Sequence, residues 1–448
     1  MNNKDIIKLL VGARKEKRLS QEQLAQLIGT KRENICRIES GKQNISVETI
    51  HRISSALDLS VTFGIEENNN DVYVLKLYDE ELLSFRLYRE KLETIKAEII
   101  DINKNKKHLF PLDLKLNNEG IIKWLERRVI PKNRYYVEEI LASLNLKRND
   151  IKGIIDVCKG LSLNDAYWIT KNDFVGSYDN YNLYENHFDK ALSLIAYTGV
   201  YSGHKGFTTS PELTTNGMLP KAWRYLDNDG IYLYKGGSTI GSNSGREPYM
   251  EYYAYQIAKA MGIDAIEYVL VKWKGILASK CKLFTSKDIS YIPIGRLVES
   301  GDLKDIIKYY DRLGDKYSRH IRDMLVFDAL IMNEDRHFGN FGLLKDNHSG
   351  KIIAPAPIFD NGLSLLCYIG KNKYSYEEMK KYSESRISAY NIDFDEIVKE
   401  VIGTRQKRQL RKIINFRFER HDKYNLNEEF LNNLEKIINE RINRFLKL

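Results

Sequence analysis

The chain has 448 residues, 43% of them hydrophobic, and a formal net charge of +9. This length exceeds what one ordinary core supports, so we expect two or three domains. No apolar run reaches the roughly 18 residues that a membrane span needs, and the charged N-terminus lacks a signal-peptide core, so we expect a cytosolic protein without a membrane partner. The basic excess is compatible with an acidic partner such as nucleic acid, or simply with a solvated basic surface.

The cysteines are too far apart to indicate a metal site. They lie at positions 36, 158, 281 and 367, and none stands near another cysteine or a histidine at zinc-ligand spacing. We therefore expect no structural metal and a reducing compartment.

The first 66 residues have apolar side chains at helical spacing. In "SQEQLAQLIG", Ser20 and Gln23 form a capping box at the start of a helix. Leu24, Leu27 and Ile28 are expected to form its apolar face, and Gly29 to end it in a tight turn.

Two further helices are predicted after this turn. Thr30 is expected to cap "KRENICRIESG", with Ile35 and Ile38 facing inward, and Ser46 to start "VETIHRISSALDL". Two short helices joined by a glycine turn inside a small all-α bundle are typical of a helix-turn-helix domain.

The stretch "LSQEQLAQLIGTKRENICRIESGK" resembles the Xre/Cro-type DNA-binding family. The resemblance implies binding to double-stranded operator DNA, usually as a homodimer on a two-fold site. It places one set of side chains at the major groove, namely Lys31, Arg32, Glu33 and Arg37. It places Gln21 and Lys42 at phosphates. The alternative is a helical protein-interaction domain with a solvated basic face.

The polar segment at 67–71 is predicted to be a linker, because the apolar period changes across it. After it, "VYVLKLYDEELLSFRLYR" indicates a β-hairpin. Residues from about 90 to 164 are predicted to be mostly helical, and residues 201–290 to be rich in strands with one helix at "EPYMEYYAYQIAKAM". We expect domains at 1–66, 72–286 and 287–448.

Residues 203–223, "GHKGFTTSPELTTNGMLPKAW", are rich in glycine and hydroxyl side chains. We expect a loop between two strands whose backbone N–H groups could hold phosphates. Lys235 ends the alternating strand "GIYLYKGG" and could bind nucleotide phosphates. Glu251 lies on the inward stripe of the next helix, where an unpaired carboxylate would be costly, so we expect it to pair with Lys235.

The stretch "MNEDRHFGNFGLL" follows a buried apolar run. Asp335 and Asn340 have the spacing of the D-x-x-x-x-N catalytic loop of kinases. A carboxylate there can accept the proton of an acceptor hydroxyl, and an amide oxygen can bind a metal ion beside the phosphates. His337 either supports this loop or only packs beside it.

A further carboxylate follows in "APIFDNG". Asp360 stands before Asn-Gly, a turn dipeptide, and after a short apolar segment that looks like a buried strand end. The position suits a metal-binding aspartate, although the Phe of the usual D-F-G motif is replaced by Asn.

The ordered set of loop, lysine, helix glutamate, D-x-x-x-x-N and aspartate resembles the HipA-type toxin kinases. "MEYYAYQIAKAMGI", "NEDRHFGNFGLL" and "APIFDNG" carry this resemblance. It implies an α+β protein-kinase-like domain with two lobes, with Asp335 as the catalytic aspartate, Asn340 and Asp360 as ligands of Mg²⁺, and Lys235 in contact with ATP. It also implies self-phosphorylation in the Gly-rich loop, at Ser210, Thr214 or Thr215.

The resulting hypothesis is an ATP-dependent serine/threonine protein kinase fused to an operator-binding, antitoxin-like domain, acting in growth control and transcriptional autoregulation. By resemblance its substrate is a translation factor or an aminoacyl-tRNA synthetase. Two alternatives stay open. One is a transcription factor with a nucleotide-sensing but non-catalytic kinase-like domain, and the other is a small-molecule phosphotransferase of the aminoglycoside type.

Overall fold

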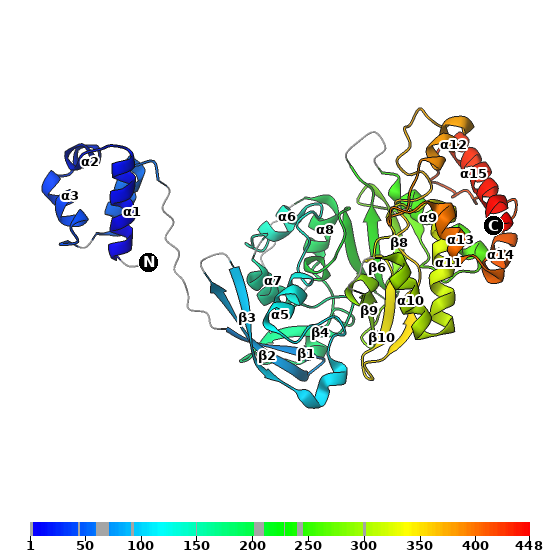
Figure 1. Cartoon of the computed structure of the whole chain (residues 1–448), viewed down its shortest axis with the longest axis horizontal. Coiled ribbons are helices and arrows are strands. Elements are labelled where there is room, and N and C mark those ends of the chain that lie inside the picture. Colours follow the sequence, from blue (N-terminus) through cyan, green and yellow to red (C-terminus); the bar gives the residue numbers. More distant parts are fainter. Residues whose placement is uncertain are drawn as a thin grey trace. The chain divides into compact units, whose positions relative to one another are not determined.

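The structure is a computed structural model that describes residues 3–43, 45–59, 71–90, 94–148, 150–200, 210–227, 229–239, 245–298 and 302–448. Residues before 70 and those from 70 onward form two separate compact units (Figure 1). None of the described helices combines the length and apolar character that crossing a membrane requires.

The smaller unit contains the helices α1 (Asn3–Glu16), α2 (Gln21–Leu27), α3 (Arg32–Glu39) and α4 (Val47–Ala56). The predicted capping box of Ser20 and Gln23 is confirmed at the start of α2, and Ser46 caps α4. Gly29 follows α2 with φ of +63°, a left-handed conformation that glycine adopts without a steric penalty.

Two details of this unit correct the prediction. Thr30 does not cap α3, because the N-cap is Lys31 and the Thr30 hydroxyl instead accepts a hydrogen bond from Asn34 Nδ2 (3.1 Å). Leu27 is 59% exposed, whereas Ala25 is fully buried. A helix turns roughly 100° per residue, so the buried stripe through Leu24, Ala25 and Ile28 leaves Leu27 at its outer edge.

The larger unit contains three antiparallel sheets in its described residues. The first has the order β3-β2-β1-β4, the second β5-β6-β8-β7 and the third β11-β10-β9. The strands are β1 (Asp71–Leu77), β2 (Glu80–Glu90), β3 (Thr94–Ile102), β4 (Tyr167–Lys171), β5 (Lys221–Leu226), β6 (Gly230–Gly236), β7 (Val269–Trp273), β8 (Ile276–Lys282), β9 (Ile289–Pro293), β10 (Gly342–Asp346) and β11 (Ile352–Pro355).

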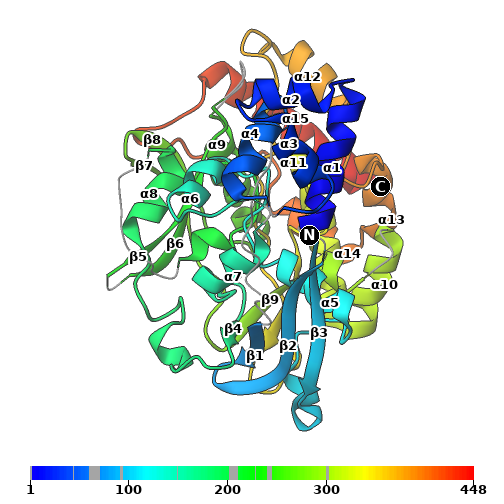
Figure 2. The ribbon, with the colours of Figure 1, turned by 90° about the vertical axis from the view of Figure 1, so that its left-hand side faces the viewer.

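Helices surround these sheets, and α13, α14 and α15 pack against α11 (Figures 1 and 2). The α-helices are α5 (Asn118–Glu126), α6 (Val137–Ala142), α7 (Ile151–Cys158), α8 (Lys190–Thr198), α9 (Glu247–Met261), α10 (Leu303–Leu313), α11 (Asp315–Ile331), α12 (Tyr376–Glu384), α13 (Phe394–Val401), α14 (Thr404–Arg411) and α15 (Glu428–Lys447). The short 3₁₀ helices are η1 (Lys104–Leu109), η2 (Tyr178–Asn180), η3 (Pro211–Leu213) and η4 (Ile294–Arg296).

The predicted hairpin after the linker is confirmed as β1 and β2, which turn at Tyr78 and Asp79. The prediction of a mostly helical segment from 90 to 164 misses β3, which pairs with β2 along its edge. Apolar and polar residues alternate only weakly in its sequence, "TIKAEIIDI". The strand forms because it pairs with the long strand β2, and the local sequence pattern does not show this pairing.

The candidate phosphate loop also differs from the prediction. It does not join two strands, because α8 precedes it and β5 follows it. Residues 201–209 lie outside the described residues. The described part begins with Ser210 and the short helix η3, and runs into β5 at Lys221.

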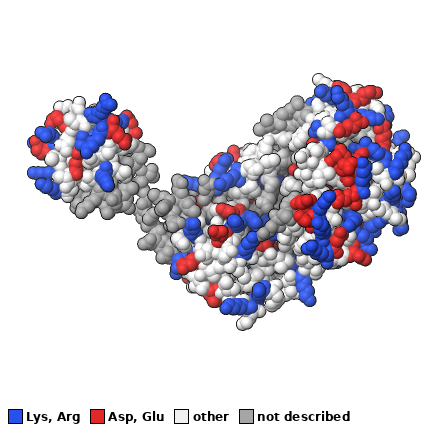
Figure 3. Space-filling model, viewed as in Figure 1, with Lys and Arg blue, Asp and Glu red and all other residues white. Residues whose placement is uncertain are grey.

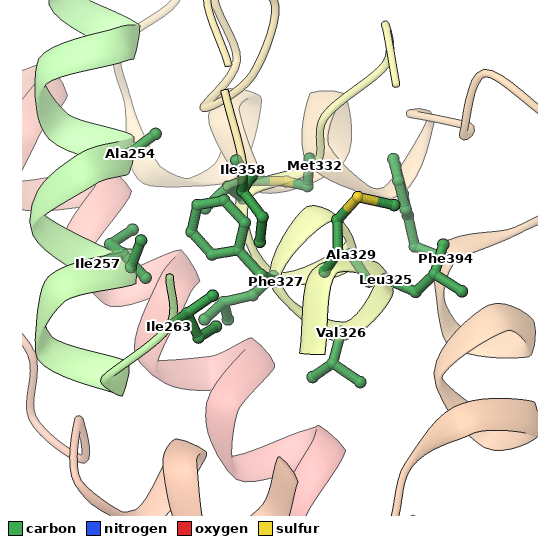
Figure 4. Close-up of a cluster of buried hydrophobic side chains, with 14 of the residues drawn as sticks. Ala254, Ile257, Ile263, Leu325, Val326, Phe327, Ala329, Met332, Ile358 and Phe394 are labelled. Carbon is green, nitrogen blue, oxygen red and sulfur yellow. The ribbon is translucent and has the colours of Figure 1, made fainter. Parts of the chain in front are cut away.

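One hydrophobic core joins α9, α11 and the segment before Asp360. Figure 4 shows Phe327 of α11 and Ile358 between the two helices, facing Ala254 and Ile257 of α9. The side chains of all four are 1% exposed or less. This packing keeps Glu251, the end of α11 and Asp360 in a fixed relation to one another.

Charge on the larger unit is mixed on the face shown in Figure 3, where acidic and basic side chains lie side by side. The net charge of the chain therefore does not correspond to a single basic surface on that face, and it does not by itself indicate a nucleic-acid partner for the larger unit.

Candidate functional site

Lys235 lies at the centre of a buried ion cluster. It stands near the end of β6, opposite Lys221 of β5 and Ser279 of β8, and it is 7% exposed. Its ammonium group donates to Glu251 Oε1 and, at 2.5 Å, to Asp360 Oδ1. The predicted pairing of Lys235 with Glu251 is confirmed, and Asp360 joins it from a segment 125 residues away.

Glu251 connects this cluster to the backbone of the Asp360 turn. Its side chain is 1% exposed, and its Oε2 accepts the N–H of Asn361 at 2.7 Å. A buried carboxylate is stable only when its oxygens are paired, and both oxygens of Glu251 are. Helix α9 thus positions Lys235 and the Asp360 turn at once.

Asp360 has a strained backbone and a strongly perturbed carboxylate. Its φ is +59°, in the left-handed region that non-glycine residues seldom adopt outside turns and functional sites. Burial would raise the pKa of Asp360, but the charges of Lys235 and Lys221 outweigh burial and hold that pKa well below its usual range. The carboxylate is therefore ionised at physiological pH.

The loop after α11 holds Asp335 and Asn340. Helix α11 ends at Ile331, and Met332 follows with φ of +54°. Asn333 accepts the N–H of Asp335 at 3.1 Å, and Asn340 Nδ2 donates to the carbonyl of Asp335 at 3.0 Å. These bonds bring the two predicted residues together. Burial, followed by the charge of Asp360, raises the pKa of Asp335.

Arg336 ties this loop to the Asp360 segment, and the sequence analysis did not single it out. Its guanidinium donates to both carboxylate oxygens of Asp328 at 2.8 and 2.9 Å. It also donates to the carbonyls of Asn340 (3.1 Å) and Phe359, and to Asn361 Oδ1 at 2.5 Å. Asp328 lies inside the apolar run "DMLVFDALI". It could have indicated a buried cationic partner nearby, because a buried aspartate needs one.

His337 is exposed, and its Nδ1 accepts the N–H of Gly339 at 3.0 Å. The ring thus supports the turn from the solvent side and does not pack in the core.

Lys221 is a second buried cation that sequence reasoning missed. It is 6% exposed, faces the same side of the sheet as Lys235, and donates to the carbonyl of Asn216 at 2.9 Å. Burial, together with the charge of Lys235, lowers the pKa of Lys221 to about 7. Gly217 has φ of +92°, a conformation that favours glycine, and a Cβ there would lie 2.1 Å from Lys221 Nζ, so a side chain at this position would require the amine to move.

The segment from Ser210 to Lys221 is anchored by an ion pair between Arg134 and Glu212 that is 0% exposed on both sides. Arg134 also donates to the carbonyls of Glu212, Thr215 and Lys221. Arg134, just before α6, therefore fixes the backbone of the segment that leads to Lys221.

The three candidate phosphorylation sites lie on this anchored segment. Ser210 and Thr214 are buried, and the Thr214 hydroxyl donates to the carbonyl of Leu161 at 2.8 Å. Thr215 is only half-buried, and its hydroxyl donates to the carbonyl of Pro211 at 2.6 Å. In the described residues no hydrogen bond joins these hydroxyls to Asp335, so their modification stays a prediction.

In the smaller unit, the predicted DNA-reading side chains point to solvent. The exposed ones are Lys31, Arg32, Glu33, Arg37 and Lys42. Gln21 is half-buried and donates to Glu39 Oε2 at 2.9 Å. Glu39 also pairs with Arg14 at 2.6 Å, which locks α1, α2 and α3 together.

Comparison with known proteins gives a family match for the N-terminal part of the chain and a partial match to a protein kinase. Residues 12–63 match the helix-turn-helix family, which confirms the predicted N-terminal domain. An alignment of 131 positions, which covers 26% of the chain, shows 30% identity to the serine/threonine-protein kinase CtkA of Helicobacter pylori strain J99. That match spans only 40% of the relative's length.

Two solved structures are similar at low identity. The Helicobacter pylori proinflammatory kinase CtkA is 20% identical with a TM-score of 0.39, over 51% of this chain and 93% of that one. The complex of HipA, HipB and operator DNA from a toxin–antitoxin system of Shewanella oneidensis MR-1 is 14% identical with a TM-score of 0.47, over 84% of this chain and 98% of that one.

The chain therefore combines a helix-turn-helix domain with a mixed α+β unit. Within its sequence lies a region similar to a serine/threonine protein kinase.

Proposed function

We propose that the chain is an ATP-dependent serine/threonine protein kinase of the HipA type, joined to an operator-binding domain, and that it acts in growth control and in regulation of its own transcription. The observation that carries the kinase proposal is one contact network. Lys235 binds Glu251 and Asp360, while Arg336 ties the loop of Asp335 and Asn340 to the Asp360 turn.

The residues divide the work of phosphoryl transfer among them. Lys235, held by Glu251, binds phosphates of ATP, and Lys221 offers a second amine on the same side of the sheet. Asp335 orients the acceptor hydroxyl and takes its proton. Its raised pKa suits this role, because a carboxylate with a higher pKa is a better proton acceptor.

The donor atoms of the site fit Mg²⁺. The amide nitrogen of Asn340 donates to the carbonyl of Asp335, so the amide oxygen of Asn340 can bind a metal ion. Lys235 donates to only one carboxylate oxygen of Asp360, so the other oxygen can also bind the ion. Mg²⁺ takes few protein oxygens and fills its other positions with phosphates and water. When bound, the ion would offset the negative charge of the phosphates. The low pKa of Asp360 keeps this ligand charged.

Phosphate transfer from labelled ATP tests the proposal. With Mg²⁺, the full-length protein is expected to label itself or a protein in a cell lysate, and Asp335→Asn is expected to lower the rate by at least about 100-fold, the usual share of a general base. Equal rates for the two proteins would overturn the kinase proposal. Nucleotide binding without turnover would favour a sensor, and phosphate found on an aminoglycoside or sugar but on no protein would favour a small-molecule phosphotransferase.

The protein substrate is assigned by resemblance alone, as a translation factor or an aminoacyl-tRNA synthetase. Among the self-phosphorylation candidates, Thr215 is the one that solvent reaches. Ser210 and Thr214 would need the anchored segment to open before either could react.

The exposed face of α3 predicts DNA binding by the smaller unit. Arg32→Ala with Arg37→Ala is expected to weaken binding of the dimer to DNA from upstream of its own gene by about 30-fold or more, because each of the two lost base contacts costs about 1–3 kcal/mol. Gel-shift titration measures the effect. Lys8→Ala with Lys15→Ala on α1 removes the same charge from exposed positions outside α3. An equal loss in that control would mean that α3 does not read the bases.

A further inference from the structure

A cavity of about 760 Å³ lies between the start of α8, strand β5 and the turn that joins β7 to β8. Its volume is in the range of ligand-binding pockets. None of Lys221, Lys235, Glu251, Asp335 and Asp360 lines it. It is therefore separate from the candidate active site, and the proposed phosphoryl transfer assigns it no role. Figure 2 shows α8 beside the strands of the second sheet.

One part of the cavity lining comes from a strand at the edge of a sheet. Strand β5 is the outermost strand of the second sheet, and alternate residues of an edge strand turn their N–H and C=O groups away from the neighbouring strand. Trp223 does so, because its N–H donates to Glu212 Oε1 (2.8 Å) and its carbonyl accepts from Ser193 Oγ (3.0 Å).

Tyr225 stands two residues further along and faces the same way. Ile231 is the residue opposite Tyr225 on β6. The carbonyl of Ile231 accepts the N–H of Leu283, on the side of β6 that faces away from β5. Within the described residues no hydrogen bond uses the outward N–H or carbonyl of Tyr225. Tyr225 also lines the cavity, so the outward main-chain donor and acceptor without a partner in the described residues belong to a residue of the cavity wall.

The other walls are aromatic and basic. Aromatic rings come from Phe188, Trp223, Tyr225 and Trp273. Positive or protonatable groups come from His187, Lys190, Arg224 and Lys274, and the acidic residue in the lining is Asp227. The Arg224 guanidinium lies 4.7 Å from the centre of the Trp273 ring. An occupant that complements these walls is acidic and also carries apolar side chains.

We propose that the β5 edge at Tyr225–Asp227 binds an extended acidic peptide segment of a partner protein, which joins the sheet as an additional strand. A peptide strand uses the free N–H and carbonyl of Tyr225 for main-chain hydrogen bonds. Its side chains alternate between the two sides of the strand. Carboxylates reach Lys190, Arg224 or Lys274, and apolar side chains contact the aromatic rings.

The first test uses the full-length protein and a fluorescein-labelled hexapeptide, Glu-Leu-Glu-Tyr-Glu-Leu. Fluorescence anisotropy is expected to show saturable binding, and the counterpart with Lys in place of Glu is expected to bind about tenfold more weakly or not at all. N-methylation of alternate residues removes main-chain donors and is expected to weaken binding by about tenfold. No saturable binding, or no effect of N-methylation in either register, overturns the proposal.

The second test reverses charge in the cavity. Lys190→Glu with Lys274→Glu is expected to weaken peptide binding by about tenfold or more. The matched control is Lys304→Glu with Lys423→Glu, which likewise changes one lysine in the first turn of a helix and one in an exposed bend elsewhere on the unit.

Equal losses in the two charge-reversal pairs contradict a specific site. Circular dichroism and thermal unfolding show whether each variant is folded, and the N-methylated peptide tests the wild type without any substitution. ATP and single-stranded oligothymidylate serve as competitors. Displacement of the peptide by either of them at lower concentration than unlabelled peptide would assign the cavity to a nucleotide or nucleic acid and overturn the proposal.

Discussion

Replacing Arg336 with Met is expected to destabilise the larger unit by about 3–5 kcal/mol and to reduce phosphate transfer to background, because removing one member of a buried ion pair leaves an uncompensated charge. Arg336 is 1% exposed, and its partner Asp328 is 4% exposed. The substitution also removes donors from the backbone of Asn340 and Phe359 and from the side chain of Asn361. Urea denaturation measures the stability, and labelled ATP measures the transfer.

A second substitution separates folding from placement of the loop. In Arg336→Met with Asp328→Asn, the buried charge is gone while Asn333 keeps an acceptor at position 328, so we expect much of the lost stability to return. The loop of Asp335 still lacks its tie to the Asp360 turn, so transfer is expected to stay at background. Recovery of transfer together with stability would show that Arg336 serves folding alone.

Local sequence pattern was sufficient for helix starts, for one pair of residues on successive elements and for two residues of one loop. Ser20 with Gln23 and Ser46 mark helix starts because capping depends on residues three positions apart. Lys235 at the end of a strand and Glu251 on an inward helical stripe could be paired because a buried carboxylate needs a cation. Asp335 and Asn340 share one loop, so their spacing indicated that they lie together.

Contacts between remote segments were not visible in the same way. Arg336 bonds to groups on α11, its own loop and the Asp360 turn, and nothing in "EDRHFGN" distinguishes it from an exposed arginine. Lys221 is buried because β5 pairs with β6 and Gly217 leaves room for its amine. Strand β3 depends on β2, and the place of β5 at the edge of its sheet follows from the order of the strands. Each of these features follows from pairing across the chain, which a single sequence encodes only indirectly.

Replacing Lys235 with Met is the second change for which we expect a large effect. It leaves Glu251 and Asp360 without the ammonium group that both contact. We expect loss of ATP binding, because the phosphates lose their cation, and a decrease of about 3 kcal/mol or more in the free energy of unfolding near neutral pH. Isothermal titration with ATP and urea denaturation measure the two effects. Lys272→Met, at an exposed position of β7, is the matched control and is expected to change neither.

The loss of stability in Lys235→Met should depend on pH in a defined direction. In the wild type the pKa of Asp360 lies below its usual range, so its contribution to stability is present above the unfolded pKa and is lost only as the pH falls through the lower folded value. Burial is already the largest influence on the pKa of Glu251 and raises it, while the charge of Lys235 lowers it. Removing Lys235 therefore raises the pKa of Glu251 further. A carboxylate with a raised folded pKa costs stability above that pKa, and the cost disappears as the pH falls through it.

Measured between about pH 8 and about pH 5.5, the difference in unfolding free energy between wild type and Lys235→Met should therefore be larger at the higher pH, because a raised pKa of Glu251 favours its protonated form as the pH falls. Lys221 remains beside Asp360, so the recovery is expected mainly from Glu251. Adding Glu251→Gln to the variant removes the titrating group and should flatten the dependence. A difference that is constant over this pH range, or that grows as the pH falls, would mean that Lys235 does not neutralise Glu251 in the folded protein, and the contact network on which the kinase proposal depends would be wrong.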